Sequence, residues 1–184
     1  MSVNTPESKK AHTSVKDMAY VALFAAMIAV CSIISIPVGT VPVTLQTFDV
    51  CLCAAMLGSK RGTLSVFIYI LLGAVGAPVF AGMKGGFGVL AGPTGGYIVG
   101  FLPAAVIIGI AAQRWERKAL PLTLSMILGV LACYLVGTVW FMIVTKMPLG
   151  ESLLLCVVPF LLPDAVKIAA AVILSNRLSK VVKL

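Results

Sequence analysis

Six apolar stretches separated by short charged connections constrain this chain more than any other feature. They cover residues 18–36, 48–58, 62–76, 97–112, 121–144 and 153–174. A helix needs roughly 17–25 apolar residues to cross the hydrocarbon core of a bilayer. The first, fifth and sixth stretches reach that length alone, whereas the other three need flanking residues. We therefore expect an all-α integral membrane protein with six transmembrane helices.

The distribution of charge predicts how these helices are oriented. The chain is 60% hydrophobic and 11% charged with a net charge of +8, whereas soluble domains are about 45–50% apolar and 25% charged. With both termini in the cytoplasm, the tails and loops on that side carry eleven Lys and Arg residues, and the other side carries only Lys84 and Lys146. Cytoplasmic loops of membrane proteins show this excess. The basic character therefore indicates topology rather than nucleic-acid binding. The high apolar and low charged fractions exclude a soluble or disordered chain.

This topology divides the chain into a cytoplasmic N-terminal tail (1–17), a membrane domain (18–176) and a cytoplasmic C-terminal tail (177–184). The first apolar stretch is too long for a signal peptide and lacks a small-residue cleavage site, so we expect an uncleaved helix that ends near 36–39. The five cysteines lie inside predicted helices without metal or disulfide spacing. His12 is the only histidine and lies in the tail. We therefore expect no metal, no cofactor and no enzymatic activity.

The connection at 41–48 is unusually apolar for a surface loop, yet it contains Thr44, Gln46 and Thr47. Non-helical backbone at membrane depth is tolerated only where protein or water covers it. One interpretation is a re-entrant loop that turns these side chains toward a cavity. The other is an ordinary frayed start of the second helix.

The segment 76–96 contains eight of the seventeen glycines. Glycine lets backbone approach a ligand closely, and several N–H groups can converge on an anion. We therefore expect a carboxylate site or a lid here, with Gly92, Thr94 and Tyr97 as candidates. A flexible loop, or a packing stripe of small residues at 92, 96 and 100, is the alternative.

Two charged residues interrupt the last apolar stretch. Asp164 and Lys167 are three residues apart, so a helix places them on one face. Ionisable residues inside a membrane face a bundle interior or a cavity because exposure to lipid costs about 2.5–3.5 kcal/mol. The pair offers an acceptor beside a cationic donor for a polar ligand, although a salt bridge that satisfies only itself is the alternative. Asp49 is a weaker candidate that we expect near the membrane interface.

Interrupted helices that direct polar groups inward are typical of transporter binding sites. In this context four segments resemble the BioY family: VTLQT (43–47), GAVGAPVFAG (73–82), LAGPTGGY (90–97) and PDAVK (163–167). BioY proteins are the substrate-capture (S) components of energy-coupling-factor (ECF) biotin transporters. The resemblance covers nearly the whole chain from the first helix onward.

The resemblance implies an S-component fold in a prokaryotic cell membrane and biotin capture from outside. It also implies delivery by a membrane T component and two ABC-type ATPases. In that family the Asp and Lys of the last helix bind the ureido ring of biotin, which assigns this role to Asp164 and Lys167. The glycine-rich loop and Tyr97 then fall near the biotin tail or its lid, and Gln46 and Thr44 are further cavity residues.

Small residues in the first helix provide a candidate docking face. The resemblance suggests that Ala22 and Ala26 contact the T component, although packing within this chain explains the same spacing.

Asp49 and Lys84 depart from the apolar or neutral residues that we expect at these positions, and Lys84 is a candidate cationic contact for the biotin carboxylate. Other interpretations are an S component for another vitamin, a stand-alone biotin facilitator and a membrane scaffold.

Overall fold

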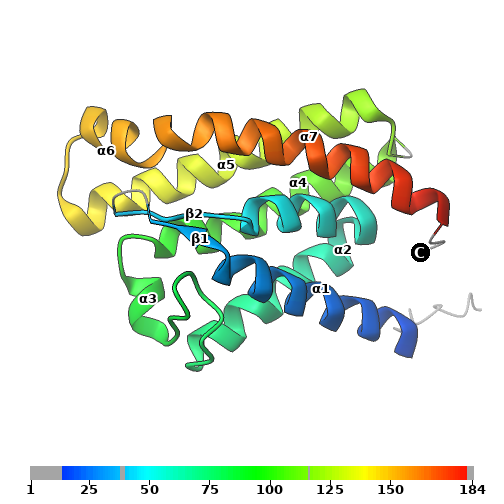
Figure 1. The fold of residues 1–184 in the computed structure, drawn as a ribbon, viewed down its shortest axis with the longest axis horizontal. Coiled ribbons are helices and arrows are strands. Elements are labelled where there is room, and N and C mark those ends of the chain that lie inside the picture. Colours follow the sequence, from blue (N-terminus) through cyan, green and yellow to red (C-terminus); the bar gives the residue numbers. More distant parts are fainter. Residues whose placement is uncertain (1–13, 38–39, 116, 182–184) are drawn as a thin grey trace, which may run out of the picture.

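The computed structural model describes residues 14–37, 40–115 and 117–181, and it forms an elongated bundle of helices (Figure 1). The expected N-terminal tail, with His12, lies largely outside these residues, whereas residues 177–181 of the expected C-terminal tail belong to the last helix. The chain is mostly helical, as expected, and a sheet of two short antiparallel strands joins the first two helices. The elements are α1 (Val15–Ile33), β1 (Ser35–Ile36), β2 (Val43–Thr44), α2 (Gln46–Ala74), α3 (Phe87–Ala91), α4 (Gly95–Arg114), α5 (Ala119–Thr145), α6 (Leu149–Cys156) and α7 (Val158–Val181).

Five helices in the described residues, rather than six, are long and apolar enough to span a membrane. The second and third apolar stretches both lie in α2, which consists of two helices joined at Gly58. The first runs from Gln46 to Leu57, and at a rise of 1.5 Å per residue it is only about 18 Å long. That length is shorter than the roughly 30 Å hydrocarbon core.

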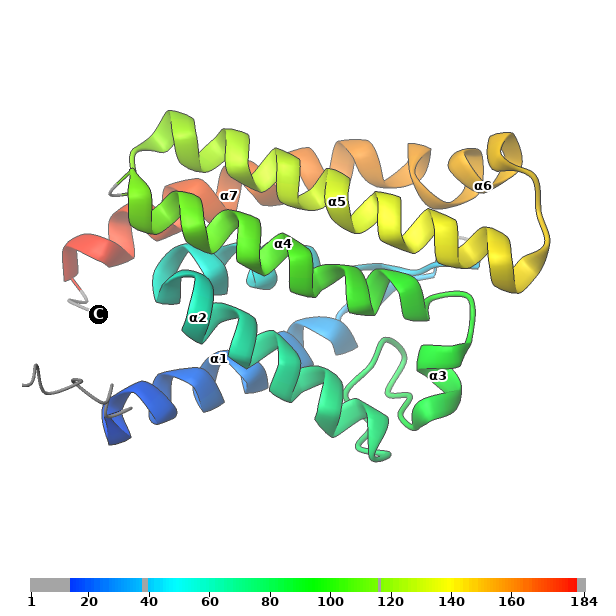
Figure 2. The ribbon, with the colours of Figure 1, turned by 180° about the vertical axis from the view of Figure 1, so that it is seen from behind.

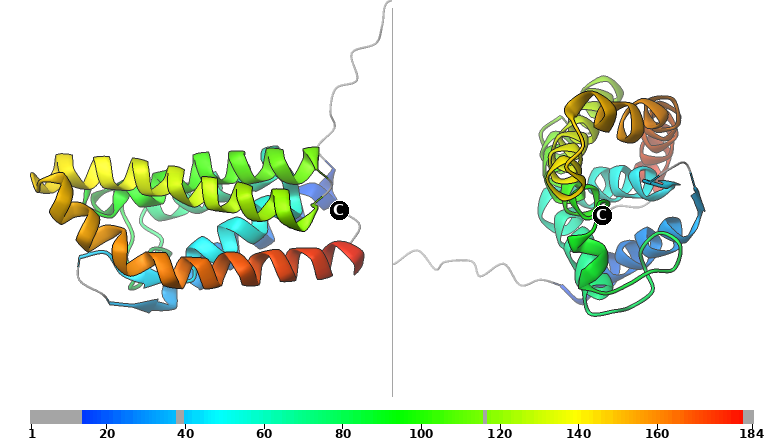
Figure 3. Two further views of the ribbon diagram at one scale, coloured as in Figure 1. Left: turned by 90° about the horizontal axis from the view of Figure 1, so that it is seen from above. Right: turned by 90° about the vertical axis from the view of Figure 1, so that its left-hand side faces the viewer.

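The chain reverses direction at Gly58, so α2 forms a hairpin (Figures 1 and 2). Gly58 has φ 75° and ψ −176°, a conformation that is essentially restricted to glycine. The two arms can pack closely because residue 62 is a glycine: a Cβ at this position would lie only 2.9 Å from Cα of Ala54. Every residue from 49 to 58 is buried, and the end view shows this arm inside the ring of other helices (Figure 3). The sequence therefore builds a short, fully enclosed helix where a full span was expected.

The two ends of the bundle differ. The described chain ends, the α2 turn and the α4–α5 connection lie at one end, and α3, α6 and the β-hairpin lie at the other (Figures 1 and 2). The last apolar stretch is interrupted at Val157, which separates α6 from α7. This break leaves the start of α7 and the loops around it free to enclose a site at the end away from the described chain ends.

Candidate functional site

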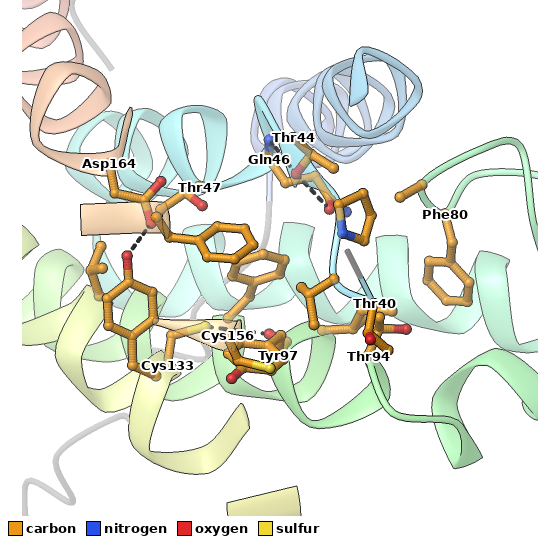
Figure 4. Close-up of a pocket in the computed structure, with 18 of the residues that line it drawn as sticks. Thr40, Thr44, Gln46, Thr47, Phe80, Thr94, Tyr97, Cys133, Cys156 and Asp164 are labelled. Carbon is orange, nitrogen blue, oxygen red and sulfur yellow. Dashed lines mark hydrogen bonds between the residues drawn. The ribbon is translucent and has the colours of Figure 1, made fainter. Parts of the chain in front are cut away.

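A cavity lies at the end of the bundle away from the described chain ends. Residues from the segments 40–47 and 80–94, together with α4, α5, α6 and α7, form its walls. It contains about 870 Å³ of empty space, counting the solvent at its opening. Figure 4 shows Asp164 and Thr47 at one side and Phe80 and Thr94 at the other. The space therefore suits an elongated ligand.

Three side chains form a polar cluster in the wall of this cavity. The Lys167 ammonium donates to Oδ1 of Asp164 over 2.7 Å, and the Tyr134 hydroxyl donates to Oδ2 over 2.6 Å. Asp164 and Lys167 are only 3% and 8% exposed, so water does little to weaken the pair. Both carboxylate oxygens are thereby oriented before a ligand arrives, and each keeps lone pairs for a further donor.

A second polar group comes from β2 and α2. The Thr44 hydroxyl donates to Oε1 of Gln46 over 3.0 Å, and the Gln46 amide nitrogen donates to the Tyr69 hydroxyl. These contacts fix the orientation of the Gln46 amide. Thr44 and Gln46 both line the cavity and are buried, and the segment that carries them includes a strand of the β-hairpin.

The far side of the cavity is built around a tight turn in the glycine-rich segment. Phe80 and Lys84 form a two-bond backbone bridge across Gly82 and Met83, both of which have positive φ. Phe80 is buried against Tyr69 with ring centroids 5.6 Å apart. This anchor places the exposed Lys84 among the residues that line the cavity.

Tyr97 and Thr94 line the cavity as well, whereas Gly92 does not appear among the described lining residues. The Tyr97 hydroxyl is within 3.0 Å of the Thr138 hydroxyl. The Gly92 N–H donates to the Val89 carbonyl in a turn, and the Gly92 carbonyl accepts from the Trp140 indole over 3.0 Å. The backbone of Gly92 is therefore engaged in local structure.

The packing alternative applies to two other glycines of the proposed stripe. A Cβ on Gly96 would lie 2.2 Å from Cβ of Trp140, and one on Gly100 would lie 3.0 Å from the Cys133 carbonyl oxygen. These glycines allow α4 to approach α5 closely.

Sequence reasoning missed Tyr134. It lies in the middle of a long apolar helix, and its hydroxyl reaches Asp164 from α5. A buried tyrosine hydroxyl usually finds a hydrogen-bond partner, so a tyrosine inside an apolar span is itself a clue. The sequence does not say which of the other helices supplies that partner.

Two further predictions concern α1 and the first turn of α2. Ala22 and Ala26 lie on the exposed side of α1, whereas Ala25 is buried. Packing within the described chain therefore does not explain Ala22 and Ala26.

Asp49 was expected near the membrane interface, but its side chain is fully buried, and neither carboxylate oxygen has a hydrogen-bond partner among the described residues. It does not line the cavity as the structure describes it.

Comparison with known proteins gives a consistent result. The BioY family model matches residues 5–184. The probable biotin transporter BioY of Pyrococcus horikoshii is 42% identical over 163 residues, covering 89% of this chain and 96% of that protein. The biotin transporter BioY of Thermotoga maritima is 44% identical over 158 residues, covering 86% and 92%. The crystal structure of the S-component for biotin from an ECF-type ABC transporter matches with a TM-score of 0.84 at 30% identity, covering 90% and 92% of the two chains.

Proposed function

The chain belongs to the BioY family, and from this premise we propose that it captures biotin as the S component of an ECF-type transporter in a prokaryotic cell membrane. The observation that carries this proposal is the buried cluster of Asp164, Lys167 and Tyr134 in the wall of a largely apolar cavity. We further infer that the termini face the cytoplasm, so the cavity opens to the outside. The arms of α2 then count as two of six helical segments.

The chemistry of biotin matches the two sides of the cavity. Its ureido ring has two N–H donors and one carbonyl acceptor, and its fused ring system is apolar. Asp164 accepts from the ureido N–H groups, and Lys167 donates to the ureido carbonyl. The bicyclic ring packs against apolar lining residues such as Phe101 and Phe160. The valerate chain then extends toward Thr94, Tyr97 and Lys84.

The remaining predicted residues have supporting roles in this proposal. Gln46 and Thr44 present a preoriented amide and hydroxyl to the ligand. Gly92 shapes the wall through its bond from Trp140 rather than binding the carboxylate directly. Ala22 and Ala26 provide the smooth outer face of α1 on which the T component docks, with two ATPases completing the transporter.

The primary test is binding of labelled biotin to the purified protein in nanodiscs after endogenous ligand has been removed. We expect biotin and desthiobiotin, which keeps the ureido ring, to compete, and thiamine and riboflavin not to compete. Competition by another vitamin instead of biotin would contradict the substrate. Uptake in cells with and without the T component then separates a capture component from a stand-alone facilitator.

Replacing Lys84 with glutamine is expected to raise the Kd for biotin about fivefold, because an exposed ion pair contributes up to about 1 kcal/mol. The neutral carboxamide of biotin should bind the variant and the parent equally. Lys146→Gln removes the same charge at the same end of the bundle and is the matched control. A loss that is equal for biotin and its carboxamide would contradict a carboxylate contact.

Tyr134→Phe removes only the hydroxyl that donates to Asp164. We expect the Kd for biotin to rise about tenfold, because a hydrogen bond to a charged group contributes about 1.5–3 kcal/mol. In contrast to Lys84→Gln, the loss should be the same for biotin and its carboxamide, because Tyr134 acts at the ureido side. Isothermal titration calorimetry with both ligands measures this difference, and an unchanged Kd would reject the role of the hydroxyl.

A further inference from the structure

The end of the bundle opposite the biotin cavity contains a second cleft, which arises from the break in α2. The first arm of α2 ends with carbonyl groups that have no partner within the helix. Arg117 satisfies two of them from the α4–α5 connection: Nε donates to the Ala55 carbonyl and Nη2 to the Met56 carbonyl, both over 2.9 Å. Gln113 packs against Gly58 beside them. The cleft holds about 740 Å³ of empty space including its opening.

The charge of this cleft is one-sided. Lys60, Arg61 and Arg117 line it, and no acidic side chain does so within the part of the chain that the structure describes. Arg61 is paired with Asp17 over 2.9 Å, and Arg117 uses two of its five N–H donors on carbonyls. Lys60 is exposed and makes no ion pair among the described residues. Cationic donors therefore remain available to an anion.

An apolar groove continues from the cleft along the outside of α2 and α4. It shares Lys60 with the cleft and is otherwise lined by Ser59, Thr63, Leu64, Phe67, Leu102 and Val106. Leu64 and Phe67 are 44% and 46% exposed. The Thr63 hydroxyl is buried and has no hydrogen-bond partner among the described residues. The surface therefore combines cations at the bundle end with an apolar groove that runs away from them.

We propose that this cleft and groove bind one anionic phospholipid, with its phosphate at Lys60 and Arg117 and an acyl chain along Leu64, Phe67 and Val106. The free cations match the phosphate, and the groove matches a hydrocarbon chain. A free phosphate ion would use only the first of these features. The cleft is lined by residues of the α2 turn and the α4–α5 connection, which lie at the bundle end with the described chain ends (Figure 1). The expected cytoplasmic loops of that end are basic. Basic pockets between helices on the cytoplasmic side bind anionic lipid headgroups.

Native mass spectrometry of the full-length, delipidated protein with short-chain phosphatidylglycerol or phosphatidylcholine tests this proposal. We expect the wild type to retain phosphatidylglycerol preferentially. Lys60→Glu should lower that affinity about thirtyfold, since two charge units change and each contributes about fivefold near an anionic headgroup. Val106→Trp leaves the charge unchanged but fills the groove, and it should also abolish the preference.

Lys118→Glu is the matched control, because it makes the same charge change at the same end but does not line the cleft or the groove. An equal loss in Lys118→Glu, or no preference for the anionic lipid, would overturn the proposal in favour of a general basic surface. Competition by inorganic phosphate together with an unaffected Val106→Trp would overturn it in favour of a free-anion site. Retained biotin binding by each variant verifies folding, because the biotin cavity lies at the opposite end.

Discussion

Asp164→Asn is expected to raise the Kd for biotin about 100-fold. The asparagine side chain keeps the size of aspartate, but it replaces one acceptor oxygen by an N–H donor. That donor would face Lys167, Tyr134 or the ureido ring, all of which donate at this point. Losing a hydrogen bond to a charged group costs about 1.5–3 kcal/mol, and a donor left without an acceptor adds to this cost.

Titration of labelled biotin into purified variants measures this loss. Asp17→Asn is the matched control, because it removes a paired carboxylate from the ion pair with Arg61 at the opposite end of the bundle. Its Kd should equal that of the wild type. A folded Asp164→Asn protein that binds biotin with unchanged affinity would reject the assignment of the ureido site to α7.

The polar part of the candidate site was more predictable from sequence than the path of the chain around it. A carboxylate and an ammonium in an apolar stretch have few acceptable environments, so Asp164 and Lys167 indicate a cavity without knowledge of the fold. Their spacing of three residues also predicts their contact, which the structure shows at 2.7 Å. Tyr134 gave no comparable indication, because its partner depends on how α5 packs against α7.

The interrupted helices were only partly predictable. The sequence GSKRG at 58–62 separates two apolar stretches and indicates a break. It does not show that the first arm is a short helix enclosed by the others, because that outcome depends on close contacts such as Gly62 with Ala54 and Gly109 with Ser59. The break at Val157 has no glycine, and only Pro159, two residues later, indicates an interruption there. Hydropathy therefore located the apolar segments but did not determine how many cross the membrane.

The glycine-rich segment shows a different limit of prediction from sequence. Its glycines were equally compatible with ligand binding and with packing. Their roles depend on what a Cβ would meet: nothing within 4 Å at Gly86 and Gly88, but the Trp140 side chain at Gly96. Such contacts are determined by neighbouring helices rather than by local sequence, so the residues of the loop that line the cavity could not be separated from those that pack.

Removing both charges of the buried pair tests whether Asp164 and Lys167 bind the ligand or only pair with each other. Lys167→Met leaves the Asp164 carboxylate without its cation, and removing one partner of a buried pair costs about 3–5 kcal/mol. We expect the apparent melting temperature in detergent to fall by about 10 °C. The double variant Asp164→Leu/Lys167→Met leaves no unpaired charge, and apolar replacement of a whole pair is often neutral or stabilising. The Tyr134 hydroxyl does lose its acceptor, which costs about 1–3 kcal/mol.

The double variant should therefore recover part of the melting temperature lost in Lys167→Met, but not the biotin binding. Relative to Lys167→Met, the double variant then regains stability without regaining biotin binding. A purely structural salt bridge does not explain this result, because its replacement by packed apolar side chains would leave the ligand site intact. A double variant that is stable and binds biotin would show that the pair satisfies only itself, and the ureido ring would have to be sought at Gln46 and Thr44. The measurement requires only melting curves and biotin titrations on the same four proteins: the wild type, Asp164→Leu, Lys167→Met and the double variant.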